Sequence, residues 1–257
     1  MNTEFGSSLK QWRQQRRMSQ LELGLSANVS ARHISFLETG RSKPSRGMVL
    51  QLCDELAIPL PARNQLLTAA GLAPAYQKRD LDTADMQPAR EALSWMMQRH
   101  DPFPAIAMDR HWHILQINES ASRLLSGMGL GIGDSLIEAF LTSPQIQQSV
   151  ENLSEVAFHT RARLQTESAH LGGDPVLLDA AERLSELIDD EVETHQGVLP
   201  AFVPTTYAFG GMSLSFFSTF SQFGTAEDIA LSEIRIEMMF PADDATRDIL
   251  MAMGAQH

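Results

Sequence analysis

The chain opens with apolar residues that recur at helical spacing between polar ones. Leu9 and Trp12 form the first such stripe and predict a helix over residues 8–17. Comparable stripes between residues 45 and 71 predict two more helices. The later of these ends at Gly71, because a glycine just past a helix is a common stop. The pattern therefore predicts a small helical unit at the start of the chain.

Two shorter helices are predicted between these, with a tight turn at Asn28. Ser19 followed by Glu22 is the pattern of a capping box, in which each side chain satisfies a backbone N–H of the other residue. Ser30 is placed to cap the next helix and Gly40 to end it. Three leucines are expected to supply the apolar contacts of the first short helix: Leu21, Leu23 and Leu25. Two short helices at a steep angle are what a DNA major groove accepts.

Residues 5–70 resemble the helix-turn-helix domain of the phage repressor and Cro (XRE-like) class. The residues that carry the resemblance are Ser19-Gln20, Val29-Ser30, Ile34-Ser35, Leu37-Glu38 with Gly40, and Pro44-Ser45. In that class an arginine of the first helix pairs with the glutamate that closes the recognition helix, and Arg13 and Glu38 occupy those positions. The resemblance implies an all-α domain of five helices that binds double-stranded operator DNA.

The same resemblance implies which residues contact the DNA. They are Gln20, Ser30, Ala31, Arg32, His33, Phe36, Thr39, Arg41 and Lys43. Of these, Ala31, Arg32, His33 and Phe36 would meet base edges, and Gln20, Thr39, Arg41 and Lys43 would hold the DNA backbone. Arg32 can make a bidentate contact to guanine. His33 departs from the polar amides common at its position, so the operator sequence does not follow from the resemblance.

The charge of the chain is divided unevenly. The formal net charge is −12, yet residues 1–70 hold nine Lys and Arg against five Asp and Glu, a balance of +4. The remainder has a balance of −16. A basic module on an acidic body suits DNA binding, since the module attracts phosphates and the body is repelled except where the module docks. Acidic surfaces also keep proteins soluble, which explains the body but not the segregation.

Length and cysteine usage bound the class of protein. The 257 residues suggest about two domains. Cys53 is the only cysteine, so no intramolecular disulfide can form, and we expect it to be a small core residue. The start of the chain lacks a signal-peptide pattern, and no apolar run nears the length of a membrane span. We expect a soluble, cytoplasmic protein without membrane contact.

Alternation replaces helical spacing in parts of the remaining chain. Short strands are predicted at residues 105–108 and 113–118, followed by an Asn-capped helix over 119–126. Later alternating runs predict strands at 212–216 and 234–240, with helices in the middle of the chain. The body is therefore expected to be an antiparallel sheet with packed helices, and the whole chain to be α+β. A strand pair followed by an Asn-capped helix is how PAS-type sensor domains open.

This part is also similar to the MmyB-like ligand-binding domain, which follows this kind of helix-turn-helix in a class of bacterial regulators. The similarity rests on residues 104–109, Trp112, residues 118–125, Asp174-Pro175 with its Leu-rich helix, and the closing pair of strands. It departs from the family where an acidic run at 189–191 and Val198-Leu199-Pro200 replace the usual aromatic-rich segment. The resemblance implies a PAS-like domain that holds a fatty acid or acyl-type ligand in an apolar cavity. No other cofactor is expected.

A lipid-like ligand needs apolar side chains around its tail and a few polar groups at its head. Six of the 12 Phe lie between residues 202 and 223, and the chain holds 13 Met; these residues can line a cavity or form an ordinary core. A carboxylate head would take an arginine or a neutral donor. The candidate ligand contacts are Trp112, Phe158, His159, Arg161, Arg163, Tyr207, Phe209, Phe216 and Phe220, with His195 as a further polar candidate.

Enzyme and metal patterns are not recognisable. His111 and His113 alternate on a predicted hairpin, but no cysteine pair or HExxH spacing accompanies them, so no metal ligands are assigned. No serine lies in a GxSxG elbow, and no catalytic residue is assigned.

The predicted organisation is a DNA-binding domain at 1–71, a linker and helix at 72–102, and an MmyB-like, PAS-type ligand-binding and dimerisation domain at 103–257. The expected function is that of a ligand-responsive bacterial transcription regulator, a repressor that acts as a homodimer. The alternative is a DNA-binding regulator whose second domain is a protein-interaction or dimerisation module without a small-molecule ligand.

Overall fold

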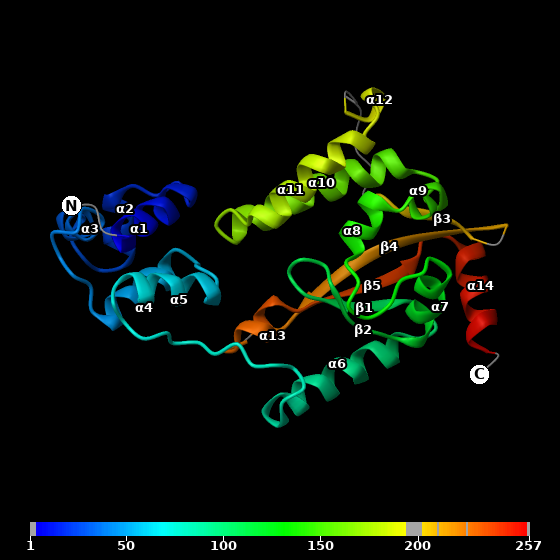
Figure 1. The fold of residues 1–257 in the computed structure, drawn as a ribbon, viewed down its shortest axis with the longest axis horizontal. Helices are drawn as coiled ribbons and strands as arrows, with labels where there is room; N and C mark the ends of the chain where they lie inside the picture. The colour runs from blue at the N-terminus through cyan, green and yellow to red at the C-terminus, as the bar shows by residue number, and fades with distance from the viewer. Residues whose placement is uncertain (1–3, 194–201, 210, 225, 256–257) are drawn as a thin grey trace. The chain divides into compact units, whose positions relative to one another are not determined.

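The computed structural model describes residues 4–193, 202–209, 211–224 and 226–255. The chain forms two compact units, the first made mainly of residues up to Lys78 and the second of most residues from Arg79 onward. Figure 1 colours the elements of both units along the chain. The domain limits inferred from the sequence stay predictions.

The first unit is built from five helices, as predicted. They are α1 (Glu4–Gln15), α2 (Gln20–Ser26), α3 (Ala31–Glu38), α4 (Arg46–Glu55) and α5 (Leu60–Ala69) (Figure 1). Helix α1 begins earlier than the expected residue 8, because Phe5 continues the buried stripe of Leu9 and Trp12. It ends before Arg17, whose φ of 54° lies in the left-handed region outside a helix.

One apolar core joins these helices. Its fully buried members include Leu9, Leu23, Ile34, Leu37, Leu52, Cys53, Leu56 and Leu67. Burial raises the pKa of the Cys53 thiol to about 12. A thiol that stays protonated to such a high pH is unreactive, which agrees with the predicted role as a small core residue.

The predicted helix ends are present. The Ser19 hydroxyl accepts a hydrogen bond from the Glu22 N–H at 3.1 Å, and the Glu22 carboxylate accepts one from the Ser19 N–H at 2.6 Å. These bonds to Ser19 lower the pKa of Glu22. The Ser30 hydroxyl accepts from the backbone N–H of His33. Gly40 follows α3 with a φ of 73°, a conformation that favours glycine. The local signals in the sequence therefore set the bounds of α2 and α3.

The prediction for the three leucines of α2 was wrong for two of them. Leu23 is completely buried, whereas Leu21 and Leu25 are 59% and 72% exposed. A helix has 3.6 residues per turn, so residues two apart lie on nearly opposite sides. Alternate leucines cannot share the buried side of a helix as they would in a strand.

From Arg79 onward the chain forms helices around one sheet. The helices are α6 (Gln87–His100), α7 (Glu119–Gly127), α8 (Leu136–Thr142), α9 (Pro144–Ser149), α10 (Leu153–His170), α11 (Pro175–Leu184), α12 (Asp190–Glu193), α13 (Ile229–Glu233) and α14 (Asp244–Gly254), with 3-10 turns η1 (Ala84–Met86) and η2 (Ser185–Leu187). The strands are β1 (Ala105–Met108), β2 (Ile114–Ile117), β3 (Thr205–Phe209), β4 (Met212–Gln222) and β5 (Arg235–Pro241).

The strands form one antiparallel sheet in the order β2-β1-β5-β4-β3. In its centre, Ala107 of β1 faces Ile236 of β5, and Met238 of β5 faces Thr219 of β4. The early strand pair and the late strands therefore belong to the same sheet, and the α+β fold class is confirmed. Strand β3 was not predicted, and β4 continues to Gln222, beyond its expected end at residue 216.

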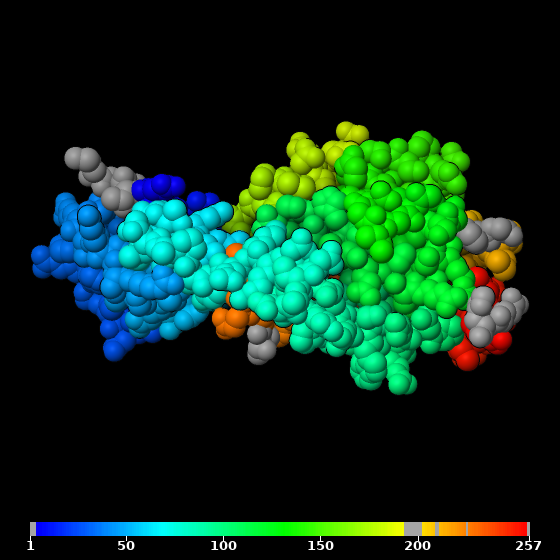
Figure 2. All heavy atoms as spheres, turned by 60° about the horizontal axis from the view of Figure 1, so that its bottom comes forward, coloured from blue at the N-terminus to red at the C-terminus, as the bar shows by residue number. Residues whose placement is uncertain are grey.

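Helix α6 covers one face of the sheet. Leu93 and Met97 of α6 are buried against Ala105, Ala107 and Ile236. The spheres in Figure 2 show the side chains of α6 on the surface that this view presents. The segment 72–102 thus contributes a packed helix as well as a connection.

Helix α7 is tied to the sheet through its cap. The Asn118 side-chain oxygen accepts from the Ala121 N–H, which confirms the predicted cap, and also from the Ala105 N–H, both at 2.9 Å. The side-chain amide donates to the Phe103 carbonyl at 2.8 Å. One buried side chain thereby joins the start of β1 to the start of α7. Among the described residues, no helix has both the length and the apolar content needed to cross a membrane.

Candidate functional site

The first candidate site is the surface of α3, which a buried ion pair positions. Arg13 Nε donates to Glu38 Oε1 at 2.6 Å and Nη2 donates to Oε2 at 3.0 Å, so the pair expected from the resemblance is confirmed. Arg13 also donates to the Met18 carbonyl, and the Gln20 amide donates to Glu38 at 2.8 Å. Both charged side chains are almost fully buried. The network therefore fixes the end of α3 against α1 and the start of α2.

The predicted base-reading residues lie along α3. Arg32 is exposed, and Ala31, His33 and Phe36 are half-buried. The guanidinium carbons of Arg32 and Arg41 lie 5.1 Å and 5.8 Å from the centre of the Phe36 ring. Two cations over one ring are held by cation–π attraction, which limits their freedom before any DNA arrives.

Some of the remaining residues predicted to contact DNA are exposed, and others make hydrogen bonds within the protein. Arg41 and Lys43 are exposed in the loop after α3. The Ser30 hydroxyl caps α3, and the Thr39 hydroxyl donates to the Ser35 carbonyl at 2.7 Å. Gln20 is half-buried and serves the Arg13–Glu38 pair in this structure. Among the residues predicted to contact DNA, the exposed basic side chains therefore lie in this loop and at the N-terminal end of α3.

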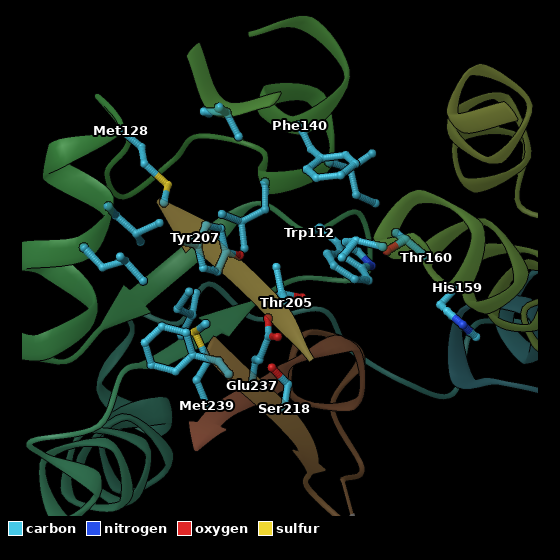
Figure 3. A pocket seen from close by; sticks show the side chains of 18 of the residues that line it. Trp112, Met128, Phe140, His159, Thr160, Thr205, Tyr207, Ser218, Glu237 and Met239 are labelled. Atoms are coloured by element: carbon cyan, nitrogen blue, oxygen red, sulfur yellow. The ribbon is translucent and has the colours of Figure 1, made fainter. Parts of the chain in front are cut away.

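The second candidate site is a cavity of about 280 Å³ within the second unit (Figure 3). This is close to the lower end of the range of about 300–1,000 Å³ that is usual for ligand pockets. Its apolar lining comes from the sheet, from α7, α8, α9, α10 and α11, and from the segments just after α7 and just before β3. These residues are Ile106, Leu124, Leu125, Met128, Leu130, Leu136, Ile137, Phe140, Ile146, Val156, Leu184, Val203, Phe216 and Met239. Leu124, Phe216 and Met239 also belong to one buried cluster, so this side of the cavity continues into the core.

Polar groups of the cavity come from the sheet and from α10. Thr205 and Tyr207 of β3, Ser218 of β4 and Glu237 of β5 lie on one face of the sheet, and Figure 3 shows them in the middle of the site. Burial raises the pKa of Glu237; a hydrogen bond from Ser218 and the charge of Arg163 act in the opposite direction. Burial, and then the charge of Glu237, raise the pKa of Tyr207. The Glu237 carboxyl therefore retains its proton to a higher pH than an exposed one.

Arg163 lies between two aromatic rings at the edge of this polar group. Its guanidinium carbon is 4.8 Å from the centre of the Trp112 ring and 3.3 Å from that of Phe220. The two ring centres are 6.3 Å apart. Trp112 has a φ of 63°, which is strained for a bulky residue and places its ring at the cavity.

The structure brings together six of the nine residues proposed as ligand contacts: Trp112, His159, Arg163, Tyr207, Phe216 and Phe220 line the cavity. Phe158 and Arg161 do not; Arg161 lies over the Phe158 ring and donates to Ser185. The side chain of Phe209 and the whole of His195 lie outside the described residues.

Helical geometry explains which residues of α10 reach the cavity. Val156, His159, Thr160 and Arg163 line it, at the spacing i, i+3, i+4 and i+7 of one helix face. Phe158 and Arg161 are out of phase with that face. Once Arg163 is placed at the cavity, the helical period alone predicts that His159 shares its face and that Phe158 and Arg161 do not.

Sequence reasoning missed Glu237, Ser218, Thr205 and Thr160. Glu237 lies between Ile236 and Met238 in an alternating strand, which is also the pattern of a strand with one face in solvent. The second face of this sheet lines a cavity instead. Nothing within the strand distinguishes these two cases, because the alternation is the same in both.

The histidines considered as metal ligands are engaged differently. The backbone N–H of His111 donates to Asp109 at 2.8 Å, and the ring of His113 lies 3.2 Å from the same carboxylate. Within the described ranges, no cluster of three His, Cys, Asp or Glu side chains could hold a metal ion.

Comparison with known proteins identifies two families. The family described as "MmyB-like transcription regulator ligand binding domain" matches residues 89–253, and the helix-turn-helix family matches residues 9–62. Both are families of regulators rather than of enzymes. No curated protein matches the chain. A solved structure, the PAS domain from Bordetella pertussis BvgS, is similar with a TM-score of 0.31 and 13% identity over 66% of this chain and 97% of that one.

Proposed function

Since this chain belongs to the family of MmyB-like transcription regulators, we propose that it is a ligand-responsive repressor that senses a fatty acid or acyl-type ligand. Its helix-turn-helix and its ligand-binding domain make it a DNA-binding regulator that responds to a small molecule. A cytoplasmic location would give it access to DNA. The sign of regulation, the apolar nature of the ligand and the dimeric state are parts of the proposal.

The observation that carries the proposal is the cavity. It is lined mainly by aliphatic, methionine and aromatic side chains, and its polar groups lie on one face of the sheet and on one face of α10. This arrangement suits a molecule with an apolar chain and one polar end.

We propose further that two copies of the chain bind together. One helix-turn-helix makes few base contacts, and regulators of this kind pair two recognition helices on half-sites about 34–36 Å apart. A ligand then changes DNA affinity only if it binds one arrangement of the pair better than the other.

Titration of DNA binding in the presence of ligand tests this function. Duplexes that bind the full-length protein are selected from a random pool, and their affinity is measured by fluorescence anisotropy with and without saturating decanoic acid or 1-decanol. We expect a change of at least about five-fold, the lower end of usual allosteric coupling.

Two tryptophan variants of α10 sharpen the test. Thr160→Trp fills the cavity, whereas Ala162→Trp places the same indole side chain at an exposed position of the same helix. The ligand effect should disappear in T160W and persist in A162W. If saturating ligand changes DNA affinity in neither A162W nor the wild type, sensing by this cavity is wrong, and a protein-interaction role for the second domain is favoured.

A further inference from the structure

The polar groups of the cavity form a row across three neighbouring strands. Phe216 of β4 pairs with Thr205 of β3, and Phe220 of β4 pairs with Glu237 of β5, so Ser218 lies between the two pairs on the same face. Tyr207 extends the row along β3. Figure 3 shows Thr205, Ser218 and Glu237 near one another in the centre of the site. A polar end of a ligand placed there would meet a carboxyl and hydroxyl groups together.

Arg163 of α10 brings a positive charge to the edge of this row. The charge of Arg163 acts on Glu237, and its guanidinium is already held between the Trp112 and Phe220 rings. His159 is the other titratable side chain of α10 that lines the cavity. An added anion would therefore share the one guanidinium with a carboxyl that is already present.

An ionised fatty acid fits this arrangement poorly. Two carboxyl groups in one site cannot both carry a charge without repulsion, so one of them must hold a proton. A hydroxyl or an amide N–H needs no such adjustment. It donates to Glu237, and its oxygen accepts from the hydroxyl of Tyr207, which lines the same cavity.

We propose that the cavity selects an uncharged acyl-type ligand, one whose hydroxyl or amide N–H donates to Glu237, over an ionised fatty acid of the same length. Glu237 is the specificity-determining residue, and the aliphatic side of the cavity takes the chain. This inference rests on the proposed sensing function, because it concerns the same cavity.

The experiment compares probes that differ only in the polar end. Binding of 1-decanol, decanamide and decanoic acid to the full-length protein is measured by calorimetry at pH 8, where the free acid is ionised. In the wild type we expect the acid to bind at least about ten-fold more weakly than the alcohol, the scale of one hydrogen bond to a charged group.

Two isosteric variants separate the roles of charge. Glu237→Gln should reduce the difference between acid and alcohol to a few-fold at most, because its amide donates to a carboxylate. Glu182→Gln removes the same charge from the exposed side of α11, away from the cavity, and should retain the wild-type difference.

A third variant tests the hydroxyl of Tyr207. Tyr207→Phe keeps the ring and should weaken alcohol binding about two- to ten-fold, as expected for a neutral hydrogen bond.

The outcomes distinguish this inference from the proposed function. If decanoic acid binds the wild type as tightly as 1-decanol, the selection by Glu237 is wrong while sensing of an apolar ligand stands. An E237Q protein that keeps the full difference would overturn the selection by Glu237 in the same way. If the folded wild type binds none of the three probes, the proposed function itself is wrong.

Discussion

Arg32 and Arg163 both lie over aromatic rings, but their surroundings differ. Arg32 is exposed at the start of α3 and lies over the Phe36 ring, so its guanidinium can reach a base. Arg163 lies between the rings of Trp112 and Phe220, and its charge acts on the nearby carboxyl of Glu237. The first arginine suits recognition of a partner, and the second organises a cavity. The same residue type therefore has different roles because of what surrounds it.

A pair of substitutions tests the role of Arg32. Arg32→Ala should weaken binding to selected DNA by about 1–3 kcal/mol and affect scrambled DNA much less, because a base contact is lost. Lys43→Ala should weaken both about equally, because a phosphate contact carries no sequence information. Anisotropy titrations at one fixed salt concentration measure both. Equal losses on the two DNAs for R32A would contradict the assignment of Arg32 to a base.

The pKa of Glu237 predicts a pH dependence of stability. Its pKa in the folded protein is raised above the ordinary value of 4.5, mainly by burial. Above pH 4.5 the unfolded chain therefore releases this proton before the folded protein does. Stability falls with rising pH through that window, because the folded state binds more protons. Glu237→Gln should remove this part of the slope and be more stable than the wild type at pH 8.

Urea unfolding of the wild type and E237Q at several pH values measures this difference. The two proteins should become similar toward about pH 4, where Glu237 is protonated in both states. Glu182→Gln, on the exposed face of α11, serves as the control and should follow the wild type. A constant difference between E237Q and the wild type at every pH would show that the raised pKa contributes nothing to stability.

At the scale of elements, capping and periodicity decided most of the helix-turn-helix. The side chains of Ser19, Glu22 and Ser30 make the predicted bonds within their own helices, and such bonds depend on neighbours three residues away. The error in α2 came from reading alternate leucines as one buried set, although a helix turns them to opposite sides. Local rules therefore work where both partners lie on the same element.

The leucines of α2 give a test at this scale. Leu23→Ala should destabilise the first unit by about 2–5 kcal/mol, because it removes a fully buried side chain. Leu25→Ala should change stability by about 0.5 kcal/mol or less, since Leu25 is exposed. Urea unfolding followed by Trp12 fluorescence, in a background with Trp95→Phe and Trp112→Phe, reports on this unit. Similar losses for the two variants would contradict the burial difference.

At the scale of the whole molecule, distant segments of the chain meet in one sheet. Strand β1 pairs with β5, whose residues lie more than a hundred positions later, and both contribute to the cavity. The sequence predicted these two strands but not the order of the strands in the sheet. Two copies of the chain are proposed to bind DNA together. Their DNA affinity would then depend on the distance between the two recognition helices as well as on the contacts that each helix makes.

Half-site spacing tests that pairing. Inserting about five base pairs between the half-sites of a selected duplex rotates one half-site by about half a turn, and we expect affinity to fall at least about ten-fold. Inserting a full turn, about ten base pairs, should restore part of it. Anisotropy titrations on the three duplexes measure the effect. Equal affinities for all three would exclude a rigid dimer on this DNA.

Features that depend on near neighbours follow from the sequence alone. The five helices, their caps and most strands of the second unit could be predicted from spacing and motifs. The Arg13–Glu38 pair joins residues 25 positions apart, and it was expected only because of the family resemblance. The aromatic and arginine candidates for the cavity could be named but not sorted, and Phe158 and Arg161 lie away from it.

The polar end of the cavity, by contrast, depends on how the chain packs in three dimensions. Glu237 stands in an alternating strand, and a polar residue there is typical of a solvent-facing side. Strand β4 pairs with the strand that carries Glu237, and residues of β3, β4 and α10 line the same cavity. These elements come from other parts of the sequence. Burial and charge balance depend on such distant neighbours, and no local pattern encodes them. The positions of the helices therefore follow from the sequence by itself. The chemistry of the cavity was decided by the tertiary structure, because it depends on which distant segments pack around Glu237.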